Sequence, residues 1–284
     1  MLRQWLRARR DRPSERSPRL LGVLLCYNDG DLVADAVRYL IEQGHDVIAW
    51  DHGSDDATAQ VLGHLRGDLV ELRTIPRSFN FYRLYPEMSR HLLANYVDRY
   101  DWISWPDQDE FLEGADRRRS YREWIEEVAA SPYDWVQFRN FNYWWTKTDD
   151  RSVVSAVERV RHYSLWPDCG PRIRSWRASA TNEREFNHNP PKGERYPALF
   201  NLRHYPMRSE QQMLRRLERD RAGLRRGGSN YHYDNMSSWR QRLTIPSASL
   251  HSDNGGELDL NPIFNWRSIY GDESSVSVPG TTDG

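Results

Sequence analysis

Residues 20–30 read LLGVLLCYNDG, and they carry the clearest fold signal in the chain. The first seven residues form a nearly unbroken apolar run, which is typical of a strand buried on both faces of a sheet. The next four, Tyr27–Gly30, are turn-forming residues. Apolar residues then recur with helical spacing over Leu32–Ile41, and Gly44 ends that helix. Strand, turn and helix in this order predict the first unit of a parallel α/β sheet.

The same alternation of strand and helix continues to residue 105. Val47–Trp50 is a second short apolar run, and Asp55 or Asp56 stands near the N-terminus of the helix expected over 57–65. The other expected elements are a strand over 69–75, a helix over 86–99, a strand over 102–105, a helix over 121–129, a long strand over 135–144 and a helix over 209–221. Repeated strand–helix units predict an α/β fold, a mostly parallel central sheet with helices on both faces.

The bulk composition excludes several classes of protein. The 284 residues carry a net charge of -1, which argues against a nucleic-acid-binding polycation. Cys26 and Cys169 are too few for a disulfide framework or a cysteine-based zinc site. No apolar run approaches the roughly 18 residues of a membrane span, and the basic stretch Met1–Arg19 lacks the apolar segment of a signal peptide. We therefore expect a cytoplasmic protein, whose basic N-terminus is either a solvated tail or a peripheral membrane contact.

Three acidic residues, Asp107, Asp109 and Glu110, follow the strand expected over 102–105. Ligands of open parallel sheets bind beyond the carboxyl ends of the strands, so these side chains stand where a ligand is expected. In an extended segment residues i and i+2 point the same way, which would aim Asp107 and Asp109 at one ligand. Two hard oxygen donors suit Mg²⁺ or Mn²⁺ held partly by substrate phosphates. The alternative is a charged turn that caps the next element.

Asp51 also follows a strand that is expected to be buried, at the corresponding edge of the sheet. A carboxylate there can accept hydrogen bonds from a base N–H or a ribose hydroxyl, as acidic residues do in other nucleotide sites. The alternative is a turn-forming residue that orders Gly53 and Ser54. The residues alone do not separate these two interpretations.

Four segments, taken together and in this order, resemble blocks of one enzyme family. Residues 21–28 (LGVLLCYN) look like its opening strand and loop, and residues 49–58 (AWDHGSDDAT) are similar to its V-x-D-x-G-S-x-D-x-T signature. Residues 105–112 (WPDQDEFL) look like its D-x-D-E-F block, and residues 203–209 (RHYPMRS) resemble the H-Y-x-x-[RK]-S stretch of one subgroup. The family that these four segments resemble is that of family 2-like glycosyltransferases, which have the nucleotide-sugar-binding fold called GT-A.

The resemblance implies a glycosyltransferase that moves a sugar from a nucleoside-diphosphate donor, a UDP- or GDP-sugar, to a hydroxyl of a carbohydrate or small-molecule acceptor. Mn²⁺ or Mg²⁺ would assist the transfer. Asp51 would hold the nucleobase, and Asn28 would lie in the donor-binding loop. Asp107 would bind the ribose or the metal, and Asp109 the metal. His204 would approach the metal or the diphosphate, since an imidazole ligand on an oxygen-rich site is acceptable to Mn²⁺.

The catalytic base has no counterpart in these blocks, because the E-D pair that marks the inverting family is not evident. An inverting transfer needs a carboxylate or a histidine to take the proton of the acceptor hydroxyl. Glu185 and His188 are the first candidates in the irregular region where acceptor loops are expected, and Asp168 and Glu183 are further ones. Ordinary solvated loop charges are the alternative for each.

Two further patterns have both a functional and a structural interpretation. Residues 142–145 (NYWW) can give an acceptor sugar an aromatic platform, or they pack within a strand. Arg172, Arg174 and Arg177 form a strand-like basic ladder that can bind a diphosphate or can line a solvated edge. A metal-dependent phosphatase or nucleotidyltransferase, and a non-catalytic carbohydrate-binding protein, are the competing functions.

The expected division of the chain follows the blocks. Residues 1–17 are a basic flexible leader, and residues 18–205 are the GT-A-like catalytic domain. Within that domain residues 18–115 are the nucleotide-binding half and residues 116–205 the acceptor half. A helical C-terminal extension over 206–270 and a disordered tail over 271–284 complete the prediction.

Overall fold

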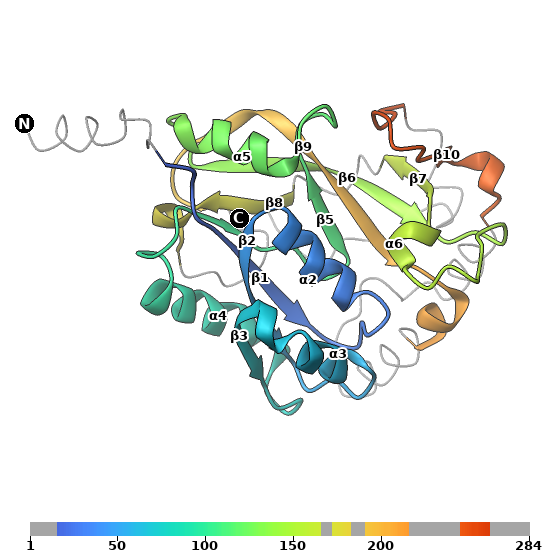
Figure 1. Ribbon diagram of the computed structural model, residues 1–284, viewed down its shortest axis with the longest axis horizontal. Helices are drawn as coiled ribbons and strands as arrows, with labels where there is room; N and C mark the ends of the chain where they lie inside the picture. Colours follow the sequence, from blue (N-terminus) through green and yellow to red (C-terminus); the bar gives the residue numbers. More distant parts are fainter. Residues whose placement is uncertain (1–15, 166–171, 183–190, 216–244, 262–284) are drawn as a thin grey trace, which may run out of the picture. The chain divides into compact units, whose positions relative to one another are not determined.

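A computed structural model describes residues 16–165, 172–182, 191–215 and 245–261 (Figure 1). The chain divides into two compact units. The first contains residues 1–141, 155–157 and 166–204, and the second contains residues 142–154, 158–165 and 205–284. Strands β6 (Trp135–Trp144) and β9 (Arg195–Met207) begin in the first unit and end in the second.

The first unit begins with the alternating strands and helices that the sequence predicts (Figure 1). These elements are β1 (Leu20–Cys26), α2 (Val33–Glu42), β2 (His45–Asp51), α3 (Thr58–His64), β3 (Leu69–Thr74), α4 (Phe81–Asn95) and β4 (Trp102–Ser104), with a 3-10 helix over Arg66–Asp68 before β3. Strands β4, β1, β2 and β3 lie side by side in this order and are parallel. The predicted α/β fold with parallel central strands and flanking helices is confirmed.

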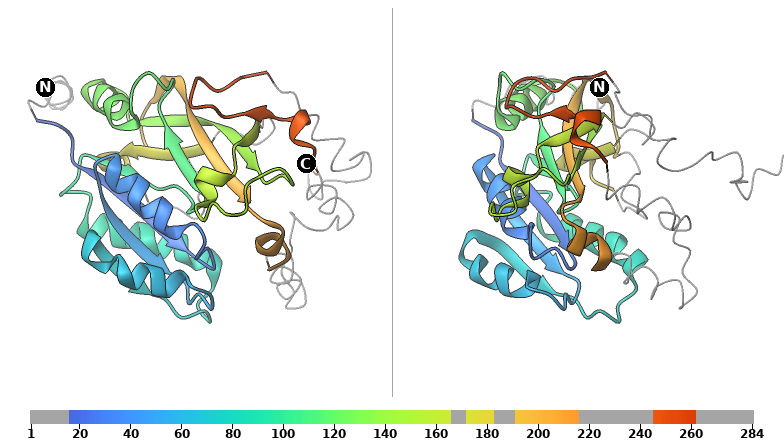
Figure 2. Two further views of the ribbon diagram at one scale, coloured as in Figure 1. Left: turned by 45° about the vertical axis from the view of Figure 1, so that its right-hand side comes forward. Right: turned by 90° about the vertical axis from the view of Figure 1, so that its right-hand side faces the viewer.

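Helices cover both faces of the parallel strands because side chains alternate along β1. Leu21 and Val23 pack with Met88 and Leu92 of α4 in one core cluster. Gly22 points the other way, toward α2, where an added Cβ would lie 3.0 Å from Leu40 Cδ1. The views in Figure 2 place α2 and α4 on opposite sides of the strands. All seven residues of β1 are buried, as the unbroken apolar run predicts.

The order of the parallel strands creates a switch point beside β1. From β1 the chain runs to β2 and β3 on one side, and it then returns to place β4 on the other side of β1. In open α/β sheets the crevice for ligands lies outside the carboxyl ends of the strands at such a point. The residues that follow β1 and β4 are therefore the first place to look for a site.

Antiparallel strands extend the sheet beyond β4. Strand β8 (Arg172–Arg177) pairs with β4, and β6 pairs with β8. Strand β5 (Glu110–Glu113) follows the acidic turn and pairs with β9, which brings His204 opposite Glu110. Helix α5 (Tyr121–Ala130) begins at a capping box formed by Ser120 and Glu123.

A chain of uncharged polar side chains lies inside the first unit, and we call it the neutral network. Its members are His45, Trp102, Ser104, Tyr121 and Ser175. Ser104 and Ser175 are cross-strand partners on β4 and β8, and their hydroxyl oxygens are 3.0 Å apart. His45 Nδ1 donates to the carbonyl oxygen of Leu40, so its Nε2, 3.0 Å from Ser104 Oγ, accepts. Each of these buried polar groups therefore has a partner.

The second unit contains β7 (His162–Leu165), β10 (His251–Ser252), the ends of β6 and β9, and a helix over 210–215. Tyr143 stacks on Tyr205 and on Tyr163, with ring centroids 4.6 and 5.4 Å apart. Residues 245–261 form a 3-10 helix over Ser247–Ser249 and then β10, so this part of the expected extension is not α-helical. Among the described residues, no helix combines the length and apolar character that a membrane crossing needs.

Helix α4 differs from its predicted bounds by several residues at both ends. Proline suits the first turn of a helix, which is why the sequence predicts a start at Pro86 and an end at Arg99. Helix α4 instead begins at Phe81 and ends at Asn95, with Pro86 inside it. Burial of Leu84 and Tyr85 in the core extends the helix upstream of the proline. Downstream, the N–H groups of Tyr96 and Val97 both bond to the carbonyl oxygen of Leu92, which ends the regular pattern.

Candidate functional site

The loop after β1 is bound to the loop after β2 by a series of hydrogen bonds. Asn28 takes a left-handed backbone conformation, with φ of 56°. Its backbone N–H donates to Ser54 Oγ at 3.0 Å, and its side-chain amide exchanges hydrogen bonds of 2.7 and 2.9 Å with Asp55. Asp29 N–H donates to Thr58 Oγ1 at 2.9 Å. Hydrogen bonds therefore join the two loops to each other at the carboxyl ends of β1 and β2.

Asp51, at the end of β2, serves the turn that follows it. Its carboxylate accepts from Ser54 Oγ at 2.5 Å and from the Ser54 N–H at 3.3 Å, and the residue is only 2% exposed. Gly53 in this turn has φ of 63°, and a Cβ there would lie 2.8 Å from the backbone N of Arg77. This geometry is that of the turn-forming interpretation, and contact of Asp51 with a nucleobase stays a prediction.

The acidic residues after β4 form a turn rather than an extended segment. Strand β4 ends at Ser104, and the N–H of Glu110 donates to the carbonyl oxygen of Asp107 at 3.0 Å. The Asp107 N–H in turn donates to the Glu110 carboxylate at 3.0 Å. Strand alternation therefore does not apply to Asp107 and Asp109, because these hydrogen bonds fold residues 107–110 into a turn, and a ligand shared by the two carboxylates stays a prediction.

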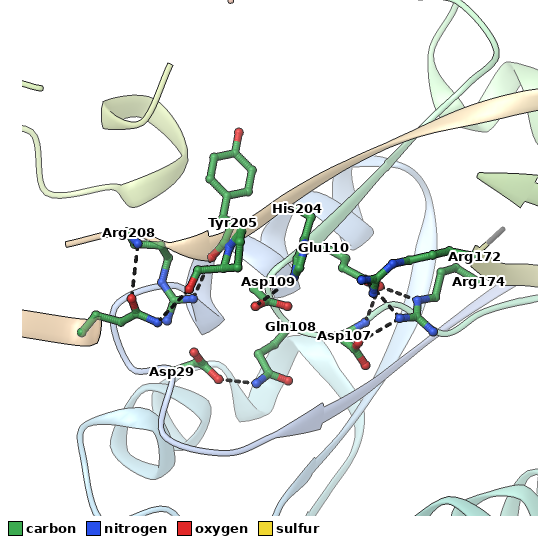
Figure 3. A network of polar contacts seen from close by, with 12 residues as sticks. Asp29, Asp107, Gln108, Asp109, Glu110, Arg172, Arg174, His204, Tyr205 and Arg208 are labelled. Carbon is green, nitrogen blue, oxygen red and sulfur yellow. Dashed lines mark hydrogen bonds and ion pairs between the residues drawn. The ribbon is translucent and has the colours of Figure 1, made fainter. Parts of the chain in front are cut away.

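Charged side chains around this turn form what we call the edge cluster. Its members are Asp107, Asp109, Glu110, Arg172, Arg174 and His204 (Figure 3). Arg174 donates from Nε and Nη2 to the two Glu110 oxygens at 2.5 and 2.9 Å, and Nη2 also contacts Asp107 Oδ2 at 2.9 Å. Arg172 Nη1 donates to Glu110 Oε1 at 2.5 Å. The side chains of Arg174 and Glu110 are fully buried.

Asp109 and His204 meet on the other side of the same turn. His204 Nε2 lies 3.5 Å from Asp109 Oδ2, and their side chains are 14% and 12% exposed. The antiparallel pairing of β5 with β9 produces this approach, since it places His204 beside the acidic turn. The fourth sequence block is thus brought beside the third.

Gln108 connects the acidic turn to the loop after β1. Its side-chain Nε2 donates to Asp29 Oδ2, a contact that crosses the switch point between β1 and β4 (Figure 3). Neither residue was among the predicted site residues. The signal available in the sequence was the adjacency of Asp29 to Asn28 and of Gln108 to Asp107, both in loops at strand ends.

The carboxylates of the edge cluster have shifted pKa values. Burial and the neighbouring carboxylates raise the pKa of Asp107, although Arg174 acts in the opposite direction. Burial alone would raise the pKa of Glu110 too, but the guanidinium groups of Arg174 and Arg172 outweigh it and lower the pKa to about 2. The two arginines therefore keep the buried Glu110 ionised at neutral pH.

Binding of a divalent cation by Asp109 and His204 stays a prediction. A carboxylate oxygen and an imidazole nitrogen already converge there, and Mn²⁺ accepts that combination of ligands. Within the part of the chain that the structure describes, no group of three or more His, Cys, Asp or Glu side chains is arranged to hold a metal ion. A cation at this pair would therefore need further oxygen ligands, such as those of a bound phosphate.

Several predicted residues lie elsewhere. Glu185 and His188, with Asp168 and Glu183, fall outside the described residues, as does the basic leader over residues 1–15. Arg172 and Arg174 contact Glu110 and so do not line a solvated edge. Arg177, on the same strand, donates to the carbonyl oxygens of Ala129, Ser131 and Tyr133 instead.

The expected aromatic platform over residues 142–145 is buried. Tyr143 is 0% exposed, Trp144 1% and Trp145 6%. Trp144 Nε1 donates to Ser164 Oγ, which fixes its ring inside the second unit. The packing interpretation is therefore the one that this geometry supports, because an acceptor sugar needs an accessible ring face.

No family model and no curated protein matches the chain. Similar solved structures include three of TarS from S. aureus. The structure of TarS residues 1–349 is 14% identical over 57% of this chain and 48% of its own, with a TM-score of 0.31. A structure of TarS is 11% identical over 79% of this chain and 43% of its own, with a TM-score of 0.34. The structure of TarS 1–349 in complex with UDP is 11% identical over 70% of this chain and 63% of its own, with a TM-score of 0.35. The chain spans less than two thirds of each of them, so its activity has to be inferred from its own residues.

Proposed function

We propose that the chain is a glycosyltransferase that binds a nucleoside-diphosphate sugar at the carboxyl ends of β4, β1 and β2. The observation that carries this proposal is the placement of polar and acidic side chains after three adjacent parallel strands, at a switch point of the sheet. The hydrogen bond from Gln108 to Asp29 joins two of these strand ends directly. The sequence blocks that resemble family 2-like glycosyltransferases lie at these same strand ends.

The nucleoside end of the donor is assigned to the joined loops after β1 and β2. Asp51 accepts a hydrogen bond from Ser54 Oγ, and Ser54 Oγ accepts one from the Asn28 N–H, so the three residues keep the two loops together. In this assignment Asp51 binds the base or ribose directly or presents the loop that does so. A UDP- or GDP-sugar is the donor class that the resemblance supports.

The diphosphate end is assigned to the edge cluster. Asp109 and His204 would hold Mn²⁺ or Mg²⁺ together with the phosphates, and Asp107 would border the ribose or the metal. When bound, the metal would neutralise the departing diphosphate as a Lewis acid. The chain's own contribution is a buried, hydrogen-bonded turn that keeps these carboxylates in place before the donor arrives.

The experiment is a screen for nucleotide release from UDP- and GDP-sugars, with and without Mn²⁺ or Mg²⁺ and with candidate acceptors. We expect release that depends on the metal and rises with an acceptor. Asp109→Asn should lower it by about a hundredfold or more, a magnitude typical of lost transition-state electrostatics. Asp98→Asn, an exposed position after α4, is the matched control and should behave as wild type.

Parallel assays test the competing functions. Release of inorganic phosphate from phosphomonoesters would indicate a phosphatase, and transfer of a nucleotidyl group would indicate a nucleotidyltransferase. Binding of sugars without nucleotide release would indicate a carbohydrate-binding protein. Unchanged release by Asp109→Asn would contradict the assignment of the diphosphate end.

A further inference from the structure

We infer that Arg174 is a positioning residue that holds Asp107 and Glu110 in the geometry the donor site needs. The inference rests on the proposed function and deepens it, since the sequence suggested Arg174 only as a direct diphosphate ligand or an edge residue. It concerns how the acidic turn is held, with the arginine acting through its carboxylate neighbours.

The guanidinium group of Arg174 is divided between two carboxylates. Nε and Nη2 donate to the two oxygens of Glu110 in a bidentate arrangement, and Nη2 also donates to Asp107 Oδ2. A planar guanidinium with a fixed fork of donors sets the orientation of both partners, which an ammonium group cannot do. Asp107 is 33% exposed at its side chain, whereas Glu110 and Arg174 are fully buried. Arg174 therefore connects a buried anchor to a carboxylate that a ligand can reach.

The backbone fixes Arg174 relative to the turn as well. The N–H of Trp105 donates to the carbonyl oxygen of Arg174 at 2.7 Å, immediately beyond the pairing of Ser104 with Ser175. Arg174 thus stands on a strand that is bonded to the very segment leading into Asp107. Glu110 closes the turn by accepting from the Asp107 N–H. Side-chain and backbone contacts together hold both ends of the turn against β8.

A buried ion pair of this kind is weak evidence for a stabilising purpose. Taking both charges out of water costs about as much as their attraction returns, and hydrophobic replacements are often neutral or stabilising. Groups that orient ligating residues, in contrast, typically affect ligand affinity by about 10- to 100-fold when they are changed. Contact with the accessible Asp107 is the feature that a purely structural pair would not need.

Arg177 provides a matched control on the same strand. It is also partly buried, pairs with Asp134 at 3.7 Å and donates to three backbone carbonyl oxygens, but its partners lie away from the acidic turn. Replacing Arg177 should lower stability without changing the turn. Replacing Arg174 should change the turn whether or not stability falls.

The test compares Arg174→Lys, Arg174→Met and Arg177→Met in two measurements. Hydrogen exchange of peptides covering residues 105–113, in protein without ligand, should speed up at least several-fold in both Arg174 variants and stay at the wild-type rate in Arg177→Met. The Kd for UDP or GDP with Mn²⁺ should rise about tenfold in Arg174→Lys, which keeps the charge and loses the fork. The double variant Glu110→Gln/Arg174→Met, which removes both main charges of the pair, should recover melting temperature and still bind nucleotide weakly.

The outcomes separate the two proposals. Exchange at residues 105–113 that is unchanged in Arg174→Lys overturns this inference alone. A double variant that recovers nucleotide affinity together with melting temperature also overturns it, because stability would then explain the loss. Wild-type protein that binds neither nucleotide overturns the proposed function, whatever the exchange rates are.

Discussion

The neutral network and the edge cluster both have members on strand β8, yet they are built from opposite chemistry. Ser104 and Ser175 belong to the first, and Arg174, the residue directly before Ser175, belongs to the second. The network exchanges hydrogen bonds among uncharged groups. The cluster holds three carboxylates against two guanidinium groups beside a histidine.

This difference indicates what each region is for. Uncharged hydrogen-bonded groups satisfy one another inside a protein at modest net free energy, so the network needs nothing further. Buried ions are costly unless they are well paired, and the cluster places ions at the carboxyl ends of the strands, where we propose that the donor binds. The following substitutions test this difference between the neutral network and the edge cluster.

The largest effect on stability is expected for Glu110→Gln. This change leaves Arg174 and Arg172 facing a neutral amide in a buried position, which typically costs about 3–5 kcal/mol of unfolding free energy. Urea unfolding followed by circular dichroism measures it. A loss below about 1 kcal/mol would show that the cluster is solvated and that the contrast with the network is wrong.

The pH dependence of stability should come from the network through His45. Burial lowers the pKa of His45 to about 4, with the carbonyl of Leu40 and Asp46 opposing and Arg122 reinforcing the shift. Between about pH 6.5 and 4 the unfolded chain binds a proton that the folded chain does not, so stability should fall by up to roughly 3 kcal/mol as pH drops through this window.

Unfolding free energies from pH 7 to pH 4 check this prediction against two variants. His45→Gln should flatten the curve in that window, whereas His64→Gln, at the exposed end of α3, should leave it unchanged. A His45→Gln curve that keeps the full slope would place the titrating group elsewhere.

A smaller loss is expected for Ser175→Ala within the network. The hydroxyl accepts from Trp102 Nε1 and from Tyr121 Oη, and its removal leaves buried donors with fewer partners. Such a loss typically costs about 1–2 kcal/mol. If Ser175→Ala proves as damaging as Glu110→Gln in the same urea assay, charge is not what distinguishes the two regions.

The smallest predicted change concerns His204. Without its imidazole the metal would lose one ligand and keep Asp109, so the Mn²⁺ activation constant of His204→Ala should rise by about tenfold. Metal-free nucleotide affinity should stay near the wild-type value. An activation constant equal to that of wild type would remove His204 from the ligand set and leave it as a neighbour of Asp109.

The sequence predicts the parallel part of the fold well, because apolar runs such as Leu20–Cys26 and Val47–Trp50 identify buried strands directly. It also predicts a candidate site at the carboxyl ends of the strands, since strand ends in a parallel sheet share one edge. The relation of Asp107 to Asp109 could not be read in the same way. The turn that separates them depends on Glu110 and on Arg174, which lies 64 residues further along the chain than Glu110.

Contacts that depend on strand order were equally inaccessible. Gln108 reaches Asp29 only because β4 returns to the side of β1, which no local pattern specifies. Arg172 and Arg174 alternate as residues of an exposed edge would, and the partner that buries them, Glu110, comes from a distant segment. The aromatic residues over 142–145 gave no sign of whether their faces are open, because packing is decided by neighbours such as Ser164.

The most direct test of the central claim is calorimetric titration of UDP and GDP into wild-type protein and Asp109→Asn, each with and without Mn²⁺. The account predicts that one nucleoside diphosphate binds wild type at least about tenfold more tightly with Mn²⁺, and that Asp109→Asn loses this gain while its metal-free affinity and fold are retained. Equal Mn²⁺ enhancement in both proteins, or no nucleotide binding by the wild type, would contradict it.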